Sequence, residues 1–204
     1  SGANVKDVSK GMGLDRRIGD KFLHAGPGYG GSCFPKDTSA LVETGKKFNA
    51  EMLITQTVIS VNESVKERMV DKILSLLGGK LDGKVISIFG VTFKPNTDDM
   101  REAPSLVIIP ALINKGAKIR VVDPKGYNEG KGLLKGVDWF DDVYKSAENS
   151  DLVVILTEWN EFRAIDLAKL ARLMNVPRMA DLRNIYSREE VLSYGFSEYD
   201  SVGR

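Results

Sequence analysis

The chain contains a single cysteine, Cys33, at a place where its thiol could act as a nucleophile. Four glycines lie within the seven residues before it, and a helix is expected to begin just after it, at Pro35. A lone cysteine is most often a small buried apolar residue. Here, however, glycines would let backbone N–H groups approach a ligand closely, and the positive end of a helix together with Lys36 would favour the thiolate. We therefore expect Cys33 to be reactive.

Two other residues near Cys33 are candidates for acid–base chemistry. His24 is the only histidine, and a glycine-rich loop separates it from Cys33. A thiol–histidine dyad, as in papain-like proteases, can be drawn from these two residues, but nothing else in the sequence supports it. Asp37 follows Cys33 by four residues, about one helical turn, so its carboxylate could orient a water beside the thiol. It could equally serve to cap the helix or interact with its dipole.

The composition favours a small molecule as the ligand. Because 29 basic side chains balance 28 acidic ones, no overall field would attract nucleic acid or an anionic membrane. No apolar run reaches the roughly 18 residues of a membrane span. A single cysteine excludes an internal disulfide framework and a tetrathiolate zinc site, and an unpaired thiol fits a reducing compartment. We expect a cytoplasmic protein.

The first 82 residues predict loops followed by helices. Eight of the 20 glycines precede residue 36. The sequence does not open with Met, and "ANVKDVSKGM", residues 3–12, is typical of the tail of a helix, so we expect a cut end. One helix is expected at 35–48 and a longer one at 51–77. The longer helix carries apolar residues at intervals of three and four: Ile54, Val58, Val61, Val65, Met69, Ile73 and Leu76. Such a face predicts packing against other helices, within the chain or at a subunit contact.

After Gly83 the pattern changes to strands that alternate with helices. Apolar, β-branched runs predict strands at 84–90, 118–124 and 151–157, with a weaker one at 177–182. Helices fit the segments 103–116, 141–148, 161–174 and 188–195. We therefore expect an α/β protein in which a helical connecting region, residues 1–82, precedes a Rossmann-like, doubly wound parallel sheet, residues 83–204.

Three basic residues are predicted at one edge of this sheet. Lys94 and Arg101 follow the first strand and Arg183 follows the fourth, at the carboxyl edge where open α/β sheets bind ligands. Each alone could be a solvated charge, but three at one edge suggest a diphosphate clamp. The segment "FGVTFKPNTD" lacks G-x-G-x-x-G, so we do not expect a dinucleotide bound in the Rossmann manner, and Asp123 is expected to be a turn residue before Pro124.

The run "RRIGDKFLHAGPGYGGSCFPKD", residues 16–37, resembles the cysteine signature of the UDP-glucose 6-dehydrogenases, a branch of the nucleotide-sugar dehydrogenases. Ser32 resembles this branch more than the N-acetylmannosamine branch, in which that position is commonly histidine. The resemblance implies oxidation of UDP-glucose to UDP-glucuronate, with two successive hydride transfers to NAD. Cys33 would trap the aldehyde as a thiohemiacetal and then carry a thioester, which water positioned by Asp37 would hydrolyse.

The resemblance also implies roles for individual residues. The nucleotide sugar would contact Phe22, Leu23, His24, Ala25, Gly26 and Gly30 from the cysteine loop, and Phe93, Lys94 and Arg183 from the second half. Lys36 and Arg101 would approach the NAD, and Arg17 would reach into a neighbouring subunit's site. His24 departs from the usual asparagine or lysine, so its contact with the ligand is expected to differ.

The resemblance extends over the whole chain but only over the latter half of a family member. The family's N-terminal Rossmann domain, and the helix that carries its catalytic lysine and asparagine, have no counterpart here, so we expect the chain alone to be inactive. The full enzyme is expected to be a homodimer or a larger homo-oligomer. Two alternatives stay open: a dehydrogenase of another UDP- or GDP-linked hexose, and a non-catalytic nucleotide-binding or interaction module with a structural Cys33.

Overall fold

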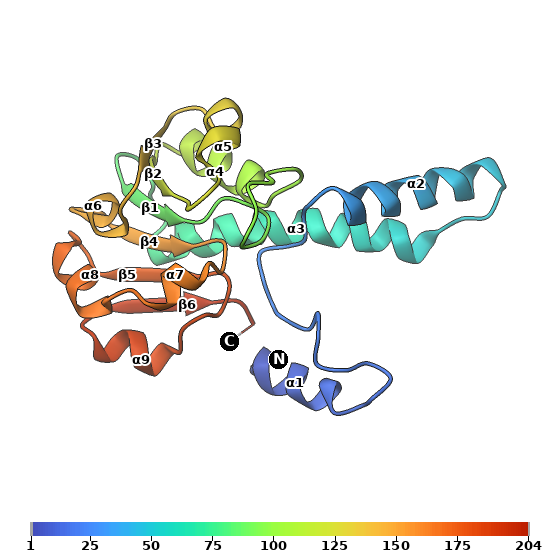
Figure 1. Ribbon diagram of the computed structural model, residues 1–204, viewed down its shortest axis with the longest axis horizontal. Helices are drawn as coiled ribbons and strands as arrows, with labels where there is room; N and C mark the ends of the chain where they lie inside the picture. The colour runs from blue at the N-terminus through green and yellow to red at the C-terminus, as the bar shows by residue number, and fades with distance from the viewer. Residues whose placement is uncertain (1, 204) are drawn as a thin grey trace.

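A six-stranded parallel sheet organises the second half of the chain (Figure 1). The structure is a computed structural model, and it describes residues 2–203. The strand order, β3-β2-β1-β4-β5-β6, is that of a doubly wound Rossmann-like sheet. Its strands are β1 (Val85–Phe89), β2 (Lys118–Val122), β3 (Val137–Phe140), β4 (Leu152–Ile155), β5 (Arg178–Asp181) and β6 (Glu198–Ser201). The expected fold class is confirmed.

Helices cover both faces of this sheet. The described helices are α1 (Val5–Gly13), α2 (Cys33–Lys47), α3 (Leu53–Leu76), α4 (Ser105–Asn114), α5 (Tyr127–Leu133), α6 (Val143–Ala147), α7 (Asn160–Arg163), α8 (Leu167–Leu173) and α9 (Arg188–Ser193). Successive residues of β4 alternate between two cores: Val154 packs with α3 and α4, whereas Val153 and Ile155 pack with α7, α8 and α9. None of the helices in the described range is both long and apolar enough to cross a membrane.

The four strands predicted from apolar runs are the four central ones, and their prediction is confirmed. The two strands that the prediction missed, β3 and β6, are the two edges of the sheet. Edge strands are covered on fewer sides, and polar residues interrupt both of their sequences, VDWF and EYDS. The signal of a continuous apolar run is therefore missing there.

Several helix boundaries differ from the prediction. The helix α2 begins at Cys33 instead of Pro35, because proline is tolerated anywhere in the first turn, where N–H groups have no intrahelical acceptor. The expected helix at 161–174 is divided into α7 and α8 by a break at which Asp166 caps α8. The helix α5 was missed because glycines interrupt its sequence.

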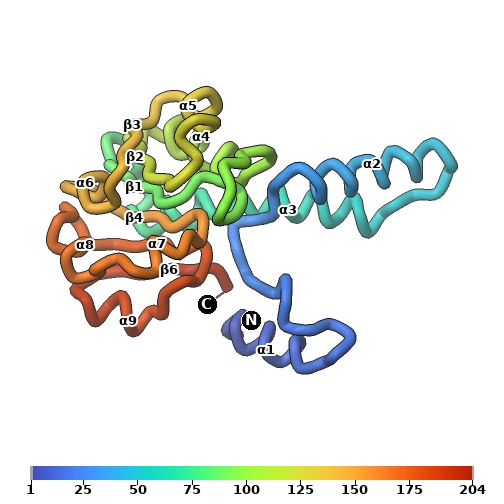
Figure 2. The backbone as a smooth tube through the Cα atoms, in the orientation of Figure 1, coloured from blue at the N-terminus to red at the C-terminus, as the bar shows by residue number. Residues whose placement is uncertain are grey.

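The apolar face predicted for α3 is buried only in part. Met69 and Ile73 lie in the core of the sheet domain, as expected, but Ile54 and Val61 are 84% and 51% exposed. The first half of α3 instead pairs with α2 in a helical arm that projects from the sheet domain (Figures 1 and 2). Leu41 and Phe48 of α2 are also exposed, so the arm carries an uncovered apolar surface.

The segment before the cysteine loop forms α1, next to the last residues that the structure describes (Figure 2). Asn4 caps this helix by accepting a hydrogen bond from Lys6 N at 3.0 Å. The N–H of Val5 donates to the carbonyl of Gly203 at 2.8 Å, which links α1 to the end of the sheet domain. The segment expected to be the tail of a helix is therefore a helix with its own cap.

Candidate active site

Cys33 is the first residue of α2, and its thiol is exposed. Ser32 occupies the N-cap position, although its side chain makes no capping hydrogen bond. The Sγ atom lies 3.7 Å from Ser32 Oγ, and within residues 2–203 no hydrogen bond joins it to His24. The thiol therefore stands at the positive end of a 15-residue helix, where the helix dipole favours an anion.

Two cations lie close enough to Cys33 to interact with its charge. Lys36 forms an ion pair with Asp37 at 2.8 Å, which raises the pKa of Lys36, and the negative charge of a Cys33 thiolate adds to that effect. Arg101 is held by Asp99 at 2.8 Å, and the pKa of Arg101 is raised mainly by Asp99 and secondarily by Cys33. Both residues predicted to approach the cofactor thus flank the thiol.

The glycines before Cys33 allow close packing of the loop against the rest of the protein. A Cβ on Gly30 would lie 2.9 Å from the carbonyl carbon of Glu102, and the N–H of Gly31 donates to Arg101 O at 2.8 Å. A Cβ on Gly26 would meet the Arg183 guanidinium at 2.8 Å. The predicted advantage of glycine was approach to a ligand, and the structure adds docking of the cysteine loop on the sheet domain.

Asn62 holds the same loop from the other side. Its side-chain oxygen accepts a hydrogen bond from Tyr29 N at 2.8 Å, and its side-chain nitrogen donates to Tyr29 O at 3.2 Å. A Cβ on Gly28, which has a φ of +116°, would lie 2.8 Å from the Asn62 oxygen. The loop between α1 and α2 is therefore fixed both to α3 and to the sheet domain.

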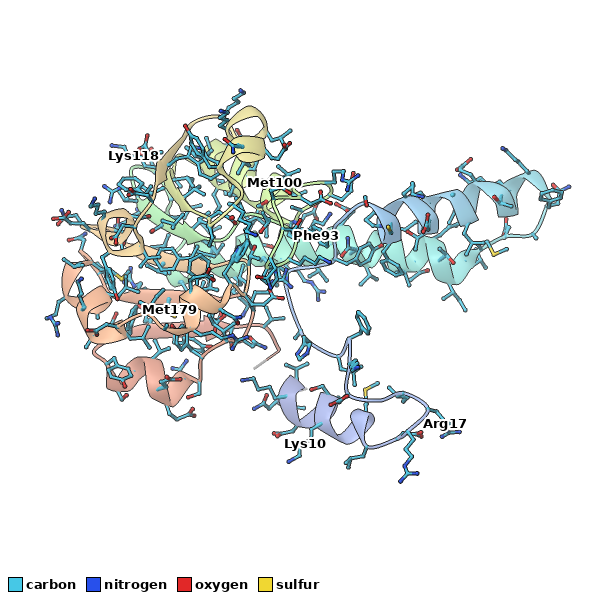
Figure 3. The ribbon with its side chains drawn as sticks, in the orientation of Figure 1. Lys10, Arg17, Phe93, Met100, Lys118 and Met179 are labelled. Atoms are coloured by element: carbon cyan, nitrogen blue, oxygen red, sulfur yellow. The ribbon has the colours of Figure 1, made fainter. Side chains whose placement is uncertain are left out.

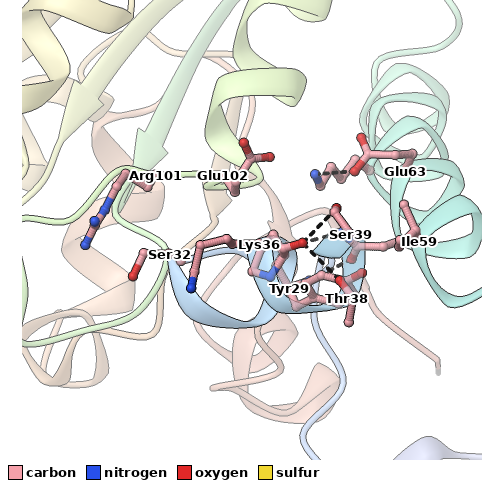
Figure 4. Close-up of a pocket in the computed structure, with 13 residues that line it drawn as sticks. Tyr29, Ser32, Lys36, Thr38, Ser39, Ile59, Glu63, Arg101 and Glu102 are labelled. Atoms are coloured by element: carbon pink, nitrogen blue, oxygen red, sulfur yellow. Dashed lines mark hydrogen bonds and ion pairs between the residues drawn. The ribbon is translucent and has the colours of Figure 1, made fainter. Parts of the chain in front are cut away.

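A cavity of about 440 Å³ lies between the start of α2, the middle of α3 and the turn at 101–102 (Figure 4). It gathers Lys36 and Arg101, the two residues predicted to approach NAD. Ser32, the residue before Cys33, also lines it. At its inner wall, the buried Lys66 pairs with Glu63 at 2.7 Å. The cavity combines cations with the positive end of α2, which suits an anionic ligand.

A second, larger cavity of about 980 Å³ adjoins the first and shares Tyr29 and Asn62 with it. Phe34, the residue after Cys33, lines this cavity, so the two neighbours of Cys33 face different cavities. Its other walls are mainly apolar side chains of α3. Six of the predicted substrate-binding residues line it: Phe22, His24, Gly26, Gly30, Phe93 and Arg183.

Among the described residues that line this larger cavity, Arg183 is the only lysine or arginine, and its side chain is mostly buried, at 14% exposed. It donates to Leu156 O at 3.0 Å and to Phe93 O at 3.1 Å, and its Nε lies 3.0 Å from Glu158 Oε2. Burial lowers the pKa of this guanidinium, against the opposing effect of Glu158. Arg183 thus links the ends of β4 and β5 to the loop that carries Phe93.

The three cations of the predicted diphosphate clamp do not line a single cavity, although Lys94 and Arg101 both interact with Asp99. Arg183 and Arg101 line different cavities, and Lys94 lines neither. Lys94 instead lies 5.2 Å from the ring centre of Phe93. The reason is local, because Asp99 draws Arg101 aside, while backbone carbonyls and Glu158 hold Arg183.

Five other predicted residues lie outside both cavities, and Cys33 is one of them, although its two neighbours in the chain line one cavity each. Arg17 pairs with Asp15 at 2.6 Å and points away from the sheet domain, as Figure 3 shows, whereas Phe93 lies where the arm meets that domain. Leu23 and Ala25 are half-buried, and they alternate along the loop with residues that line the larger cavity. Asp37 lies one turn after Cys33, but its carboxylate is engaged by Lys36.

Asp123 is both the predicted turn residue and an organiser of the ligand-binding edge. One oxygen accepts from the N–H groups of Lys125 and Gly126 at 2.9 and 2.7 Å, which is the expected turn. The other accepts from Val91 N at 2.7 Å and Thr92 N at 3.2 Å. The carboxylate therefore occupies the amides after β1 that a Rossmann fold offers to pyrophosphate.

Sequence reasoning missed Asn62, Lys66 and Tyr29. Asn62 and Lys66 are 7% and 2% exposed, and both occupy the buried face of α3. Polar residues give no periodic apolar signal, so the pattern of α3 could not point to them. Two polar residues one turn apart in a long helix are only a weak signal of function. Their role can be assigned only from the folded structure, in which the cysteine loop packs against them.

Known proteins with similar sequences cover the whole chain. Residues 87–188 match the UDP binding domain of the UDP-glucose/GDP-mannose dehydrogenase family, and residues 1–64 match its central domain. The UDP-glucose 6-dehydrogenase of Rhizobium meliloti (strain 1021) is 49% identical over 203 residues, which are 100% of this chain and 46% of that protein. UDP-glucose 6-dehydrogenase TuaD of Bacillus subtilis (strain 168) is 43% identical over 100% of this chain and 44% of its own length.

Solved structures lead to the same family. A UDP-glucose dehydrogenase from the hyperthermophilic archaeon Pyrobaculum islandicum superposes with a TM-score of 0.86 at 31% identity, over 99% of this chain and 44% of that chain. The chain thus spans about half the length of the relatives that it matches. Because two of the family's domains match in their order along the sequence and the fold agrees throughout, the chain belongs to the UDP-glucose/GDP-mannose dehydrogenase family.

Proposed function

We propose that the chain is the part of an NAD-dependent UDP-glucose 6-dehydrogenase that carries the nucleophilic cysteine and binds the UDP-sugar. One observation carries this proposal: the predicted substrate and cofactor residues separate into two adjoining cavities, with Cys33 between them in the chain. Ser32 lines the smaller cavity and Phe34 the larger one. Cys33 itself lines neither cavity, but its two neighbours in the chain face one each, so its exposed thiol lies close to both, which suits a reaction that passes hydride from a sugar to a cofactor.

The larger cavity suits a nucleotide sugar. Its volume of about 980 Å³ and its mainly apolar walls, with Arg183 as a buried cation, fit an aromatic base attached to an anionic diphosphate. Phe93 offers a ring face, and Lys94 lies beside that ring. The relatives above are UDP-glucose 6-dehydrogenases, which favours UDP-glucose among nucleotide sugars.

The smaller cavity fits part of NAD. Lys36 and Arg101 are both more than two-thirds exposed, and they lie near the start of α2, where backbone N–H groups favour phosphate oxygens. NAD, when bound, would accept one hydride from the sugar in each of two oxidations. In this chain, Asp123 fills the Rossmann position after β1, so the sheet itself is not the dinucleotide site.

Cys33 supplies the step that hydride transfer alone cannot make. Its thiolate adds to the carbonyl carbon of the C6 aldehyde, and the oxygen takes a proton to give a thiohemiacetal. Loss of a hydride to the oxidant and of the hydroxyl proton leaves a thioester. Water then attacks the thioester carbon, which releases the carboxylate and restores the thiol. The positive end of α2, Lys36 and Arg101 stabilise the thiolate in this scheme.

Two further roles complete the proposal. Asp37 orients the hydrolytic water, which requires a rearrangement of its ion pair with Lys36. The exposed apolar surface of the helical arm is the contact between copies in a homodimer or larger oligomer, and Arg17, 89% exposed at its side chain, reaches a neighbouring site. The enzyme acts in the cytoplasm, where its exposed thiol stays reduced.

Calorimetric titration with nucleotides tests the proposal. We expect UDP and UDP-glucose to bind at one site per chain, and GDP-mannose to bind more weakly. Because the chain spans less than half of its relatives, we expect no NADH from the chain with UDP-glucose and NAD. Absence of UDP binding would refute the proposed ligand, and NADH production by the chain would refute the expected inactivity.

A further inference from the structure

Asn62 is a buried polar residue on a part of α3 that is otherwise exposed to solvent. It is 7% exposed, whereas Val58 and Val61 on the same half of the helix are 39% and 51% exposed. Its amide makes two hydrogen bonds to one backbone unit, from Tyr29 N at 2.8 Å and to Tyr29 O at 3.2 Å. These bonds give the Tyr29 backbone the partners that a strand or helix would otherwise supply.

The loop reaches Cys33 from two anchors. Asn62 holds Tyr29, and Arg101 O holds the N–H of Gly31 at 2.8 Å, two residues before the thiol. The loop can pass so near Asn62 only because residue 28 is glycine, since a Cβ there would lie 2.8 Å from the Asn62 oxygen. The stem of Lys66 packs on the same glycine at 3.5 Å from that Cβ position.

Asn62 also stands where the two cavities meet, because it lines both of them. We propose that Asn62 is a positioning residue, which acts through the Tyr29 backbone to hold the segment that leads to Cys33, and so keeps the thiol near Arg101 and beside the two cavities. This inference rests on the proposed role of Cys33 as the nucleophile. Asn62 is not the reacting group in this role, and its effect is to keep the thiol within reach of Arg101, since Lys36 already shares α2 with Cys33.

The first test uses the unmodified chain. Hydrogen exchange at the Tyr29 amide, which Asn62 engages, should be at least about tenfold slower than at the His24 amide of the same loop. Within residues 2–203 the His24 amide donates no hydrogen bond. A Tyr29 amide that exchanges as fast as an unprotected peptide would overturn the inference without any substitution.

The second test measures how Cys33 selects between a charged and a neutral reagent. Lys36 and Arg101 attract the anion iodoacetate to the thiol, but they do not attract neutral iodoacetamide. In Asn62→Ala we expect the ratio of the two alkylation rates to fall about twofold, because the thiol moves away from Arg101, whereas Lys36 stays beside it on α2. General loosening of the loop would change both rates equally and leave the ratio unaltered. Ser64→Ala, an exposed position of the same helix, is the matched control and should keep the ratio.

An unchanged ratio in folded Asn62→Ala would overturn the inference. Circular dichroism shows whether Asn62→Ala folds. If it does not fold, the inference is tested by hydrogen exchange at the Tyr29 amide of the unmodified chain alone. Failure of the proposed function is detected separately, by calorimetry with UDP. A chain that does not bind UDP but shows the expected change in reagent ratio would refute the ligand and support the role of Asn62.

Discussion

Replacement of Gly30 by alanine tests whether the cysteine loop is docked on the sheet domain. An alanine Cβ at this position would lie 2.9 Å from Glu102 C, 3.1 Å from Ala103 Cα and closer still to Glu102 O. Carbon atoms in contact keep about 3.5–4.0 Å apart, so loop and turn must separate by about 0.5–1 Å. Backbone atoms cannot rotate away as a side chain can, and we expect a cost of about 1–3 kcal/mol.

Hydrogen exchange at the Gly31 amide measures this cost where it arises. That amide donates to Arg101 O across the contact, so it reports opening of the loop while the sheet stays folded. A cost of about 1–3 kcal/mol predicts exchange about 5- to 150-fold faster in Gly30→Ala. Gly132→Ala is the matched control, because a Cβ at Gly132 meets nothing within 4 Å. Equal exchange in the two variants would refute the docking of the loop.

Two further predictions concern buried polar groups at the sheet. Arg183→Met removes two part-buried hydrogen bonds to backbone carbonyls and leaves Glu158 without its cation, so it should lower the free energy of unfolding by about 3 kcal/mol in urea titrations. Arg178→Met, which breaks a more exposed pair with Glu198, should cost less than about 1 kcal/mol, and equal costs would contradict the assigned burial. Burial raises the pKa of Tyr186, assisted by Glu190 and Asp181, so its neutral form is favoured in the folded state. That contribution is complete below about pH 10, the ordinary value, and is lost as the pH rises further. In Tyr186→Phe, stability should fall less steeply between about pH 9 and 11 than in the unmodified chain, and identical slopes would contradict the prediction.

The sequence was sufficient to predict the centre of the fold. The central strands, such as β4 with its buried Leu152–Ile155, are covered on both faces, and a continuous apolar run signals this directly. The edge strands and α5 lack that signal. Only half of the face predicted for α3 is buried, because helical periodicity shows that residues share a face but does not show which surface covers them.

The sequence allowed most residues of the candidate site to be named, but it did not show how those residues are arranged in space. The lone thiol, its glycine loop and the residues carried by the family resemblance could be named from the sequence. The division of Arg101 and Arg183 between two cavities depends on Asp99 and Glu158. Asp99 lies only two residues before Arg101, but Glu158 is distant from Arg183 in the sequence and meets it only in the folded chain. Asn62 gave no signal, since its partner Tyr29 lies 33 residues away.

Protection of Cys33 by UDP-glucose tests the central claim most directly. The rate of alkylation by iodoacetamide is measured as UDP-glucose is added, with UDP as a comparison that lacks the sugar. If the sugar lies between the larger cavity and the thiol, UDP-glucose should slow alkylation to a saturating limit, and UDP should protect less. A Cys33 that reacts at the same rate at every UDP-glucose concentration would contradict the account.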